Sequence, residues 1–207
     1  MPAYLASLGG NMRSLIIRPI QAGFTLVELL IVVIIIAILA AIVVPQFSSA
    51  TRDAQEAALD ANLAAMRSAI ELFRGQHSGG IYPGGVAGSG PAGDTNTCAA
   101  GSTASTAAIN TAQAFMDHLL MYSDASGKAC NLGDAVTFKY GPYLRKGIPP
   151  DAITGKGSAV GDIVVTTAGT PLAPAAATGG WAYDTRSGQI VMNSNATDSR
   201  SNAYSTH

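Results

Sequence analysis

Residues 23–44 read GFTLVELLIVVIIIAILAAIVV, an apolar stretch in which Glu28 is the one ionisable residue. As an α-helix this stretch would extend about 30 Å at ~1.5 Å per residue, enough to cross the hydrocarbon core of a bilayer. A carboxylate inside such a helix costs roughly 2.5–3.5 kcal/mol on insertion scales, so its presence calls for a reason. The pattern predicts a transmembrane helix over 24–45 whose Glu28 serves the assembly of several copies. The alternative is that Glu28 only reaches back to the membrane interface.

The charges before this stretch predict how the helix is oriented. Arg13 and Arg18 are the charged residues that precede it. Basic residues are retained on the cytoplasmic side of a membrane, so the residues after the helix are expected outside the cytoplasm. An ordinary cleaved signal is not indicated, because the apolar block follows Gly23 and ends at Pro45 without a small-residue cleavage pattern. Met12 offers an alternative start of the chain.

A second helical segment follows Pro45. Apolar residues recur there at spacings of four and three, at Leu59, Leu63, Met66, Ile70 and Phe73. This period predicts an amphipathic helix over 46–74 with one face against a folded domain. Proline removes a helical hydrogen bond and clashes with the preceding turn, so Pro45 either kinks the helix or ends it. We expect a kink, because the helical period resumes soon afterwards.

The remaining residues, 75–207, are enough for one small domain with its own core. The formal net charge of the chain is −1, which gives no basic surface for nucleic acid. Cys98 and Cys130 form an even pair that predicts a disulfide in an oxidising compartment, closing a loop of about 33 residues. The alternative is two buried free thiols. The three histidines are scattered, and no nucleophile, base and orienting acid occur at a recognisable spacing, so no enzymatic activity is expected.

The pattern of residues 75–207 predicts helix and strand together. A helix is expected over Thr106–Tyr122, with Ile109 and Phe115 on its apolar face. Strands are expected over four segments: Ala135–Tyr140, Asp162–Thr167, Trp181–Asp184 and Gln189–Asn193. The last two flank the turn Thr185–Gly188 and predict a hairpin, with Trp181 and Tyr183 on its core side.

The order Gly23-Phe24-Thr25-Leu26-Val27-Glu28, followed by the apolar run and Pro45, resembles the N-terminus of type IV pilins and type II secretion pseudopilins. The resemblance extends over residues 21–74. It implies that 1–23 is a leader peptide, and that a prepilin peptidase cleaves between Gly23 and Phe24 and methylates the new amine of Phe24. It also implies that Glu28 recruits each subunit into a filament.

The chemistry of these residues suits those roles. A glycine before the cleaved bond places no side chain against the protease and permits an extended backbone. Glu28 lies one helical turn after Phe24, so its carboxylate can neutralise the terminal amine of a neighbouring copy where the dielectric constant is low. Thr25 is expected to satisfy its hydroxyl within the first helical turn.

The resemblance also implies a fold, partners and a location. The expected fold is α+β and pilin-like, with a long N-terminal helix, half of it transmembrane, packed on a small antiparallel sheet. The implied partners are other pilins in a homo-oligomeric filament, the prepilin peptidase, an inner-membrane platform protein, and membrane lipid before assembly, with no nucleic acid. The implied location is the bacterial inner membrane, crossed once with the N-terminus in the cytoplasm, and then a periplasmic or extracellular filament.

The sequence leaves the type of filament open. Residues 141–155 and 180–190 resemble pilin-like domains more loosely and favour a type II secretion pseudopilin, whereas the cysteine pair fits a type IV pilus pilin better. Type II major pseudopilins carry calcium in a C-terminal loop, but Asp184 and Asp198 are isolated here, so no cofactor or metal is expected, and bound calcium is the alternative. Two further hypotheses are a minor tip subunit that binds cargo, surfaces or DNA, and a membrane-anchored domain that never polymerises.

Overall fold

The computed structural model describes residues 23–169 and 171–207 of the chain. The predictions about Arg13, Arg18, Met12 and the leader up to residue 22 lie outside these residues. The described chain divides into two compact units, one that ends at Gln46 and one that runs from Phe47 to His207.

Helix α1 (Leu26–Gln76) begins in the first unit. All residues from Gly23 to Gln46 are exposed, so none of their apolar side chains is covered by the rest of the chain. Among the described residues, α1 is the one helix that is long and apolar enough to cross a membrane. Pro45 lies inside α1 and helical structure continues past it, so the proline does not end the helix. The kink at Pro45 stays a prediction.

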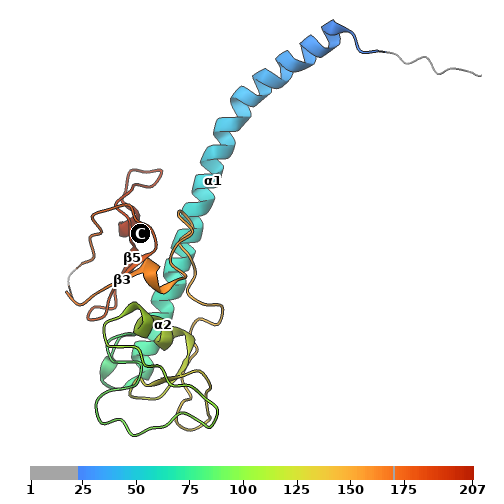
Figure 1. Ribbon diagram of the computed structural model, residues 1–207. Helices are drawn as coiled ribbons and strands as arrows, with labels where there is room; N and C mark the ends of the chain where they lie inside the picture. Colours follow the sequence, from blue (N-terminus) through green and yellow to red (C-terminus); the bar gives the residue numbers. More distant parts are fainter. Residues whose placement is uncertain (1–22, 170) are drawn as a thin grey trace, which may run out of the picture. The chain divides into compact units, whose positions relative to one another are not determined.

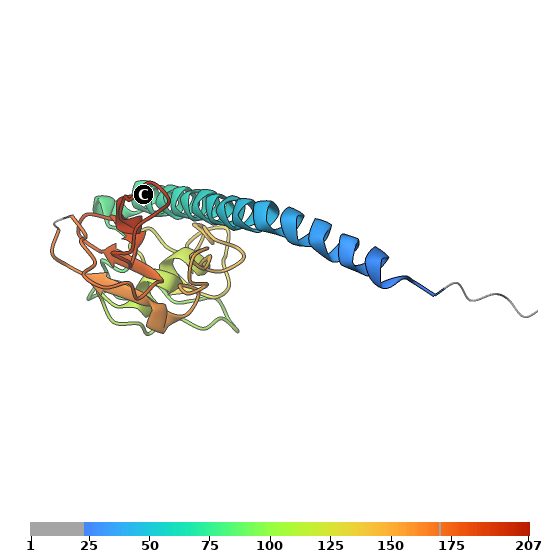
Figure 2. The same ribbon diagram turned by 90° about the horizontal axis from the view of Figure 1, so that it is seen from above.

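In the second unit, the later residues of α1 supply the predicted apolar stripe. Its five members are at most 1% exposed: Leu59, Leu63, Met66, Ile70 and Phe73. The first four form one core with Phe115 and Leu119 of helix α2 (Ala112–Leu120) and with Trp181 and Tyr183 of the sheet. Phe73 stacks against His77 and His118 instead. Figures 1 and 2 show α2 and the strands on the same side of this part of α1. The helical period therefore predicted the face of α1 that the domain covers.

The sheet that completes this core has three strands in the order β3-β4-β5. They are β3 (Ile163–Thr166), β4 (Trp181–Asp184) and β5 (Ile190–Met192). The predicted hairpin is confirmed, because β4 and β5 pair antiparallel with Trp181 opposite Met192. One pairing differs from the expected antiparallel sheet, since β3 runs parallel to β4. The long chain segment between β3 and β4 allows this crossover.

Smaller elements complete the description. A second sheet pairs β1 (Tyr122–Ser123) with β2 (Ala129–Cys130) in antiparallel fashion. Three short 3-10 helices are η1 (Ser78–Gly80), η2 (Val160–Asp162) and η3 (Tyr204–Thr206). The fold class is therefore α+β, as expected for a long helix packed on small sheets.

The aromatic residues of β4 are buried, as their spacing predicted. Both Trp181 and Tyr183 are fully buried. Their polar atoms are satisfied inside the core: the indole N–H of Trp181 donates to the carbonyl of Pro149 over 2.9 Å, and the hydroxyl of Tyr183 donates to the carbonyl of Pro83 over 2.9 Å. Because a buried donor without a partner destabilises a fold, these two bonds fix which loops cover β4.

Two predicted elements differ in the structure. The expected helix over 106–122 is shorter, because Asn110 adopts a left-handed φ of 61° and Thr111 caps α2 by accepting from the N–H of Ala114. Ile109 is consequently exposed instead of packed. The expected strand over 135–140 does not form, because one carboxylate oxygen of Asp134 accepts from the N–H groups of Val136, Thr137 and Phe138 and holds them in a turn.

The tail of the chain lies against α1. Tyr204 of η3 is buried in the core. Arg67 of α1 donates to the carbonyl of Ile190 over 3.2 Å and to a backbone oxygen of His207 over 2.6 Å. The C-terminus is beside α1 in both Figures 1 and 2. Arg67 thus links α1 to the last strand and to the tail by charge-assisted hydrogen bonds.

Cys98 and Cys130 form a disulfide, so the alternative of two free thiols is excluded. Replacing both with alanine is expected to lower the free energy of unfolding by about 2–4 kcal/mol, because the cross-link restricts the unfolded chain. A urea titration of the detergent-solubilised protein, followed by the fluorescence of its single tryptophan, Trp181, measures this change. Reduction of the wild-type protein should shift the midpoint equally. An unchanged midpoint in the double variant would contradict the prediction.

Candidate processing and assembly site

The first turn of α1 contains a reciprocal pair of hydrogen-bonded side chains. The hydroxyl of Thr25 accepts from the N–H of Glu28 over 3.2 Å. In return, one carboxylate oxygen of Glu28 accepts from the N–H of Thr25 over 2.8 Å and from its hydroxyl over 2.9 Å. This is the capping box, in which residues at the N-cap and three positions later satisfy each other's backbone donors. Thr25 therefore caps the first turn as expected, and Glu28 takes part in the cap.

The capping box and the helix dipole both stabilise the carboxylate of Glu28. A carboxylate in the first turn interacts favourably with the positive end of the helix dipole. Together with the donors of Thr25, this offsets part of the cost of keeping Glu28 in an apolar segment. Only one carboxylate oxygen of Glu28 has a hydrogen-bond partner among the described residues. The other remains available to a donor from outside the chain.

The predicted cleavage site precedes the helix. Gly23 and Phe24 lie outside regular structure, and α1 begins at Leu26. The space where a Cβ of Gly23 would lie is open, and Phe24 is 83% exposed. An exposed, non-helical peptide bond is the form of backbone that proteases cut most readily. The geometry therefore leaves the bond between Gly23 and Phe24 accessible, while cleavage and methylation stay predictions.

Comparisons with known proteins match this same part of the chain. Residues 18–44 match the family model described as the prokaryotic N-terminal methylation motif. The chain is 49% identical over 57 residues to the type IV narrow pilus major component PilA5 of Thermus thermophilus. It is 39% identical over 54 residues to the type II secretion system core protein G of Pseudomonas aeruginosa, and 39% identical over 69 residues to the type IV major fimbrial protein FimA of Dichelobacter nodosus.

The N-terminal part of this chain is therefore similar to type IV pilins and a type II secretion pseudopilin. The three alignments cover 28%, 26% and 32% of the chain. They span 49%, 38% and 44% of the respective relatives, less than half the length of each. No solved structure was found to match the chain. These three relatives are named as pilus, secretion-system and fimbrial proteins.

The two acidic residues considered for calcium both hold turns of the chain. Asp184 is fully buried, and its carboxylate accepts five hydrogen bonds, from Thr166, Gly169, Arg186 and two groups of Ser187. Burial raises the pKa of Asp184, but these hydrogen bonds outweigh it and lower the pKa to about 2. Both oxygens are thus occupied by donors of the chain. Among residues 23–169 and 171–207, no group of three or more acidic, histidine or cysteine side chains could hold a metal ion.

Asp198, the second acidic residue considered for calcium, has a similar arrangement. Its carboxylate accepts from the N–H groups of Arg200 and Asn202 over 2.8 and 2.7 Å and closes a turn of the tail. Asp198 is 7% exposed, and His207 approaches its other oxygen at 3.4 Å. The two aspartates are therefore turn-forming residues.

A pair of buried histidines was not recognised from the sequence. The rings of His77 and His118 both stack against that of Phe73, with centroid distances of 3.7 and 5.1 Å. His77 bonds the carbonyl of Phe73 through Nδ1 and the hydroxyl of Ser123 through Nε2, over 2.6 and 2.9 Å. His118 is fully buried, and its Nδ1 accepts from the N–H of Gly84 over 2.7 Å.

The surroundings of this pair keep both rings neutral. Burial, together with the neighbouring His77, lowers the pKa of His118 to about 4. Burial also lowers the pKa of His77, although the carbonyl of Phe73 and the charge of Asp124 oppose this shift. No hydrogen-bond partner is found within the described chain for Nε2 of His118. Burial therefore disfavours a protonated His118, although the backbone of Gly127 opposes this shift.

Proposed function

We propose that this chain is a non-enzymatic structural subunit of a filament of the type IV pilus kind. The observation that supports this most is the exposure of every apolar side chain between Leu26 and Val44. Such a surface is unstable in water at roughly 25 cal/mol per Å² of apolar area, so it must be covered. Lipid covers it before assembly, and the same segment of other copies covers it in the filament.

The capped end of α1 supplies the specific contact in this proposal. After cleavage, the new amine of Phe24 is positively charged and lies in an environment of low dielectric constant. The free carboxylate oxygen of Glu28 in an adjoining copy accepts from that amine, while Thr25 holds the other oxygen. Opposite charges attract more strongly there than in water, which draws an incoming subunit into position. The prepilin peptidase and the platform protein are the partners for cleavage and assembly.

The proposed location follows from the same features. The chain is inserted once in the bacterial inner membrane, with the N-terminal end of α1, which follows Arg13 and Arg18, in the cytoplasm and the domain from Phe47 onward outside it. On assembly, the subunit moves into a periplasmic or extracellular filament. The disulfide between Cys98 and Cys130 suits an oxidising compartment.

Mass spectrometry and cross-linking test this proposal together. The mature polypeptide in the native host is expected to begin at Phe24 with one methyl group on its amine. Pairs of engineered cysteines at Ile31 and Ile38, on the apolar surface of α1, should give a ladder of oligomers on oxidation. A chain that begins elsewhere would contradict the processing, and the absence of any ladder would indicate a lone membrane anchor.

Within this class we propose a type II secretion pseudopilin, with a type IV pilus pilin as the second candidate. The looser resemblance of residues 141–155 and 180–190 to pilin-like domains favours the pseudopilin. The disulfide and the 49% identity to a pilus component favour the second candidate. Deletion of the gene separates them: loss of secreted proteins from the medium supports the pseudopilin, whereas loss of sheared surface filaments with unchanged secretion supports the pilus pilin.

A further inference from the structure

A groove of about 490 Å³ lies between α1 and the tail of the chain. Its helical side is formed by Asp53, Glu56, Ala57 and Asp60, whose spacing of three, four and seven places them on one face of α1. Asp198 and Arg200 lie on the tail side. Four carboxylates thus line the groove together with one guanidinium and the imidazole of His207, so acidic groups predominate in it.

Three of these carboxylates already have partners inside the chain. Glu56 accepts from the N–H and hydroxyl of Ser199 over 2.8 and 2.7 Å. Asp60 contacts Nδ1 of His207 over 2.7 Å, and Asp198 is held by its own turn. Asp53 is exposed, and no partner for its carboxylate is found among the described residues. These contacts fix the shape of the groove and leave Asp53 available at its edge.

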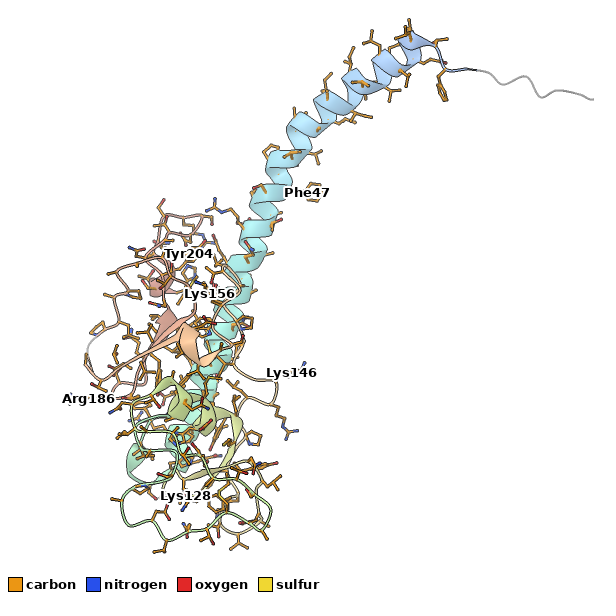
Figure 3. All side chains as sticks on the ribbon, in the orientation of Figure 1. Phe47, Lys128, Lys146, Lys156, Arg186 and Tyr204 are labelled. Carbon is orange, nitrogen blue, oxygen red and sulfur yellow. A yellow bond between two sulfur atoms is a disulfide. The ribbon has the colours of Figure 1, made fainter. Side chains whose placement is uncertain are left out.

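A rigid basic turn lies on the other flank of the same unit. Arg145 and Lys146 are both exposed, and neither side chain has a partner among the described residues. The turn is fixed at both ends, because the N–H of Leu144 donates to Leu119 over 3.0 Å and the carbonyl of Pro149 accepts from Trp181. Figure 3 shows Lys146 on one side of α1 and Tyr204 of the tail on the other.

We infer that the acidic groove receives the Arg145–Lys146 turn of a second copy of the chain. This inference rests on the proposed function, because it supplies a contact between neighbouring subunits of the filament. Complementary patches on different flanks make a heterologous interface, which repeats from copy to copy and builds an open helix instead of a closed dimer. The turn is held in place before binding, so little conformational entropy is lost when it docks.

The chemistry of the groove favours a cationic side chain over a metal ion. Calcium and magnesium need several oxygen ligands at once. Glu56, Asp60 and Asp198 are already engaged by the chain, so a metal ion would find too few free oxygens. An arginine can instead form charge-assisted hydrogen bonds with Asp53 and with the unused lone pairs of its neighbours. Arg145 provides that group on every copy.

Charge reversal tests the inference in the native host with the full-length protein. Asp53→Lys is expected to lower the fraction of subunits recovered in filaments about tenfold, because like charges then oppose each other across the contact. The double change Arg145→Glu and Lys146→Glu should lower it by a similar factor. Combining all three changes restores opposite charges and should return the fraction to within about threefold of wild type.

Matched control variants test whether the loss of assembly is specific to the groove and the basic turn. Ala54→Lys adds the same charge at the adjacent exposed position of α1, and Arg186→Glu reverses an exposed charge elsewhere on the domain. Both are expected to assemble like wild type. An oxidised Cys98–Cys130 bond in each variant verifies folding. As an independent measurement, Ala57→Cys combined with Lys146→Cys should give a ladder of cross-linked subunits, which neither single variant gives.

The outcomes separate this inference from the proposed function. If the wild-type chain forms filaments, any one of three results would overturn the inference and leave the filament function standing. These are normal assembly of Asp53→Lys, no restoration in the combined variant, and no ladder from the cysteine pair. A wild-type chain that never enters filaments would overturn both. Reduced assembly, restoration and a ladder support the contact.

Discussion

Glu28→Leu is expected to leave the protein inserted in the membrane and cleaved before Phe24, yet to abolish its incorporation into filaments. Leucine suits the apolar segment better than a carboxylate does, so insertion should not suffer. What the variant loses is the group that accepts from the terminal amine of an adjoining copy. The measurement is the amount of mature protein in sheared filaments or in the cross-linked ladder, relative to the amount in the membrane.

The capping box requires a control, because Glu28 also serves its own helix. If Glu28 acted only as a cap, Thr25→Val would reproduce the loss, since it removes the hydroxyl that completes the box. A lost N-cap costs about 1 kcal/mol and affects mainly the first turn. We therefore expect Thr25→Val to retain assembly at a reduced level while Glu28→Leu retains none.

Glu28→Gln provides the matched comparison for charge. Glutamine can keep the capping box, because its side-chain oxygen accepts from the N–H of Thr25. It cannot neutralise an amine, so assembly should be lost as it is in Glu28→Leu. Normal filaments from Glu28→Gln would show that the hydrogen-bonding shape of the residue matters and its charge does not, which would contradict the proposed role.

The elements that were predictable from the sequence depend on local patterns. The stripe from Leu59 to Phe73 repeats with the period of a helix, and its burial against the domain follows from that period alone. The hairpin around Thr185–Gly188 is likewise local, because its strands flank a short turn. The capping box is also encoded locally, since threonine and glutamate stand three positions apart at the start of the helix.

The elements that were missed depend on single residues that override a pattern. The apolar spacing before α2 predicted a longer helix, but the left-handed backbone conformation of Asn110 prevents the helix from beginning earlier. Residues 135–140 have strand-forming side chains, yet Asp134 accepts hydrogen bonds from the N–H groups of residues 136–138. Within this segment, Tyr140 alone pairs with a neighbouring segment, in a single bridge to Ser123. Backbone competition by an aspartate is difficult to recognise in a sequence, because the same residue is also common in exposed turns.

The histidine pair and the acidic groove were missed for a different reason. His77 and His118 are separated by 41 positions (118 − 77), and their approach depends on how α2 packs against Phe73 of α1. The groove similarly joins α1 to a tail far along the chain, with Asp60 and His207 separated by 147 positions. No local spacing signals either arrangement, so only the packed domain brings these groups together.

The buried histidine pair gives the chain a predicted sensitivity to acid. In the unfolded chain a histidine has a pKa near 6.5, whereas in the folded chain the pKa of His118 is lowered to about 4. Between these values the unfolded chain binds a proton that the folded chain does not. Stability is therefore complete above pH 6.5 and falls as the pH decreases toward 4.

The size of the loss follows from the same linkage. A difference of about 2.5 pH units at 1.36 kcal/mol per unit gives about 3 kcal/mol for His118, and His77 adds a loss in the same direction. For a domain of this size, that loss should lower the melting temperature by about 6–12 °C between pH 7.5 and pH 4. Asp184 responds separately, because its lowered pKa of about 2 places its loss of stability below pH 3.8.

Thermal melts of the detergent-solubilised protein by circular dichroism, at several pH values, measure this dependence, and His118→Asn isolates its cause. Asparagine can still accept from the N–H of Gly84 but cannot be protonated. The variant should therefore melt at a lower temperature than wild type at pH 7.5, and its melting temperature should fall less between pH 7.5 and pH 4. The lower melting temperature at pH 7.5 is expected because the smaller residue leaves a cavity beside Phe73. If wild type and His118→Asn lost stability in parallel between pH 6.5 and pH 4, the acid response would have to come from groups other than this buried ring.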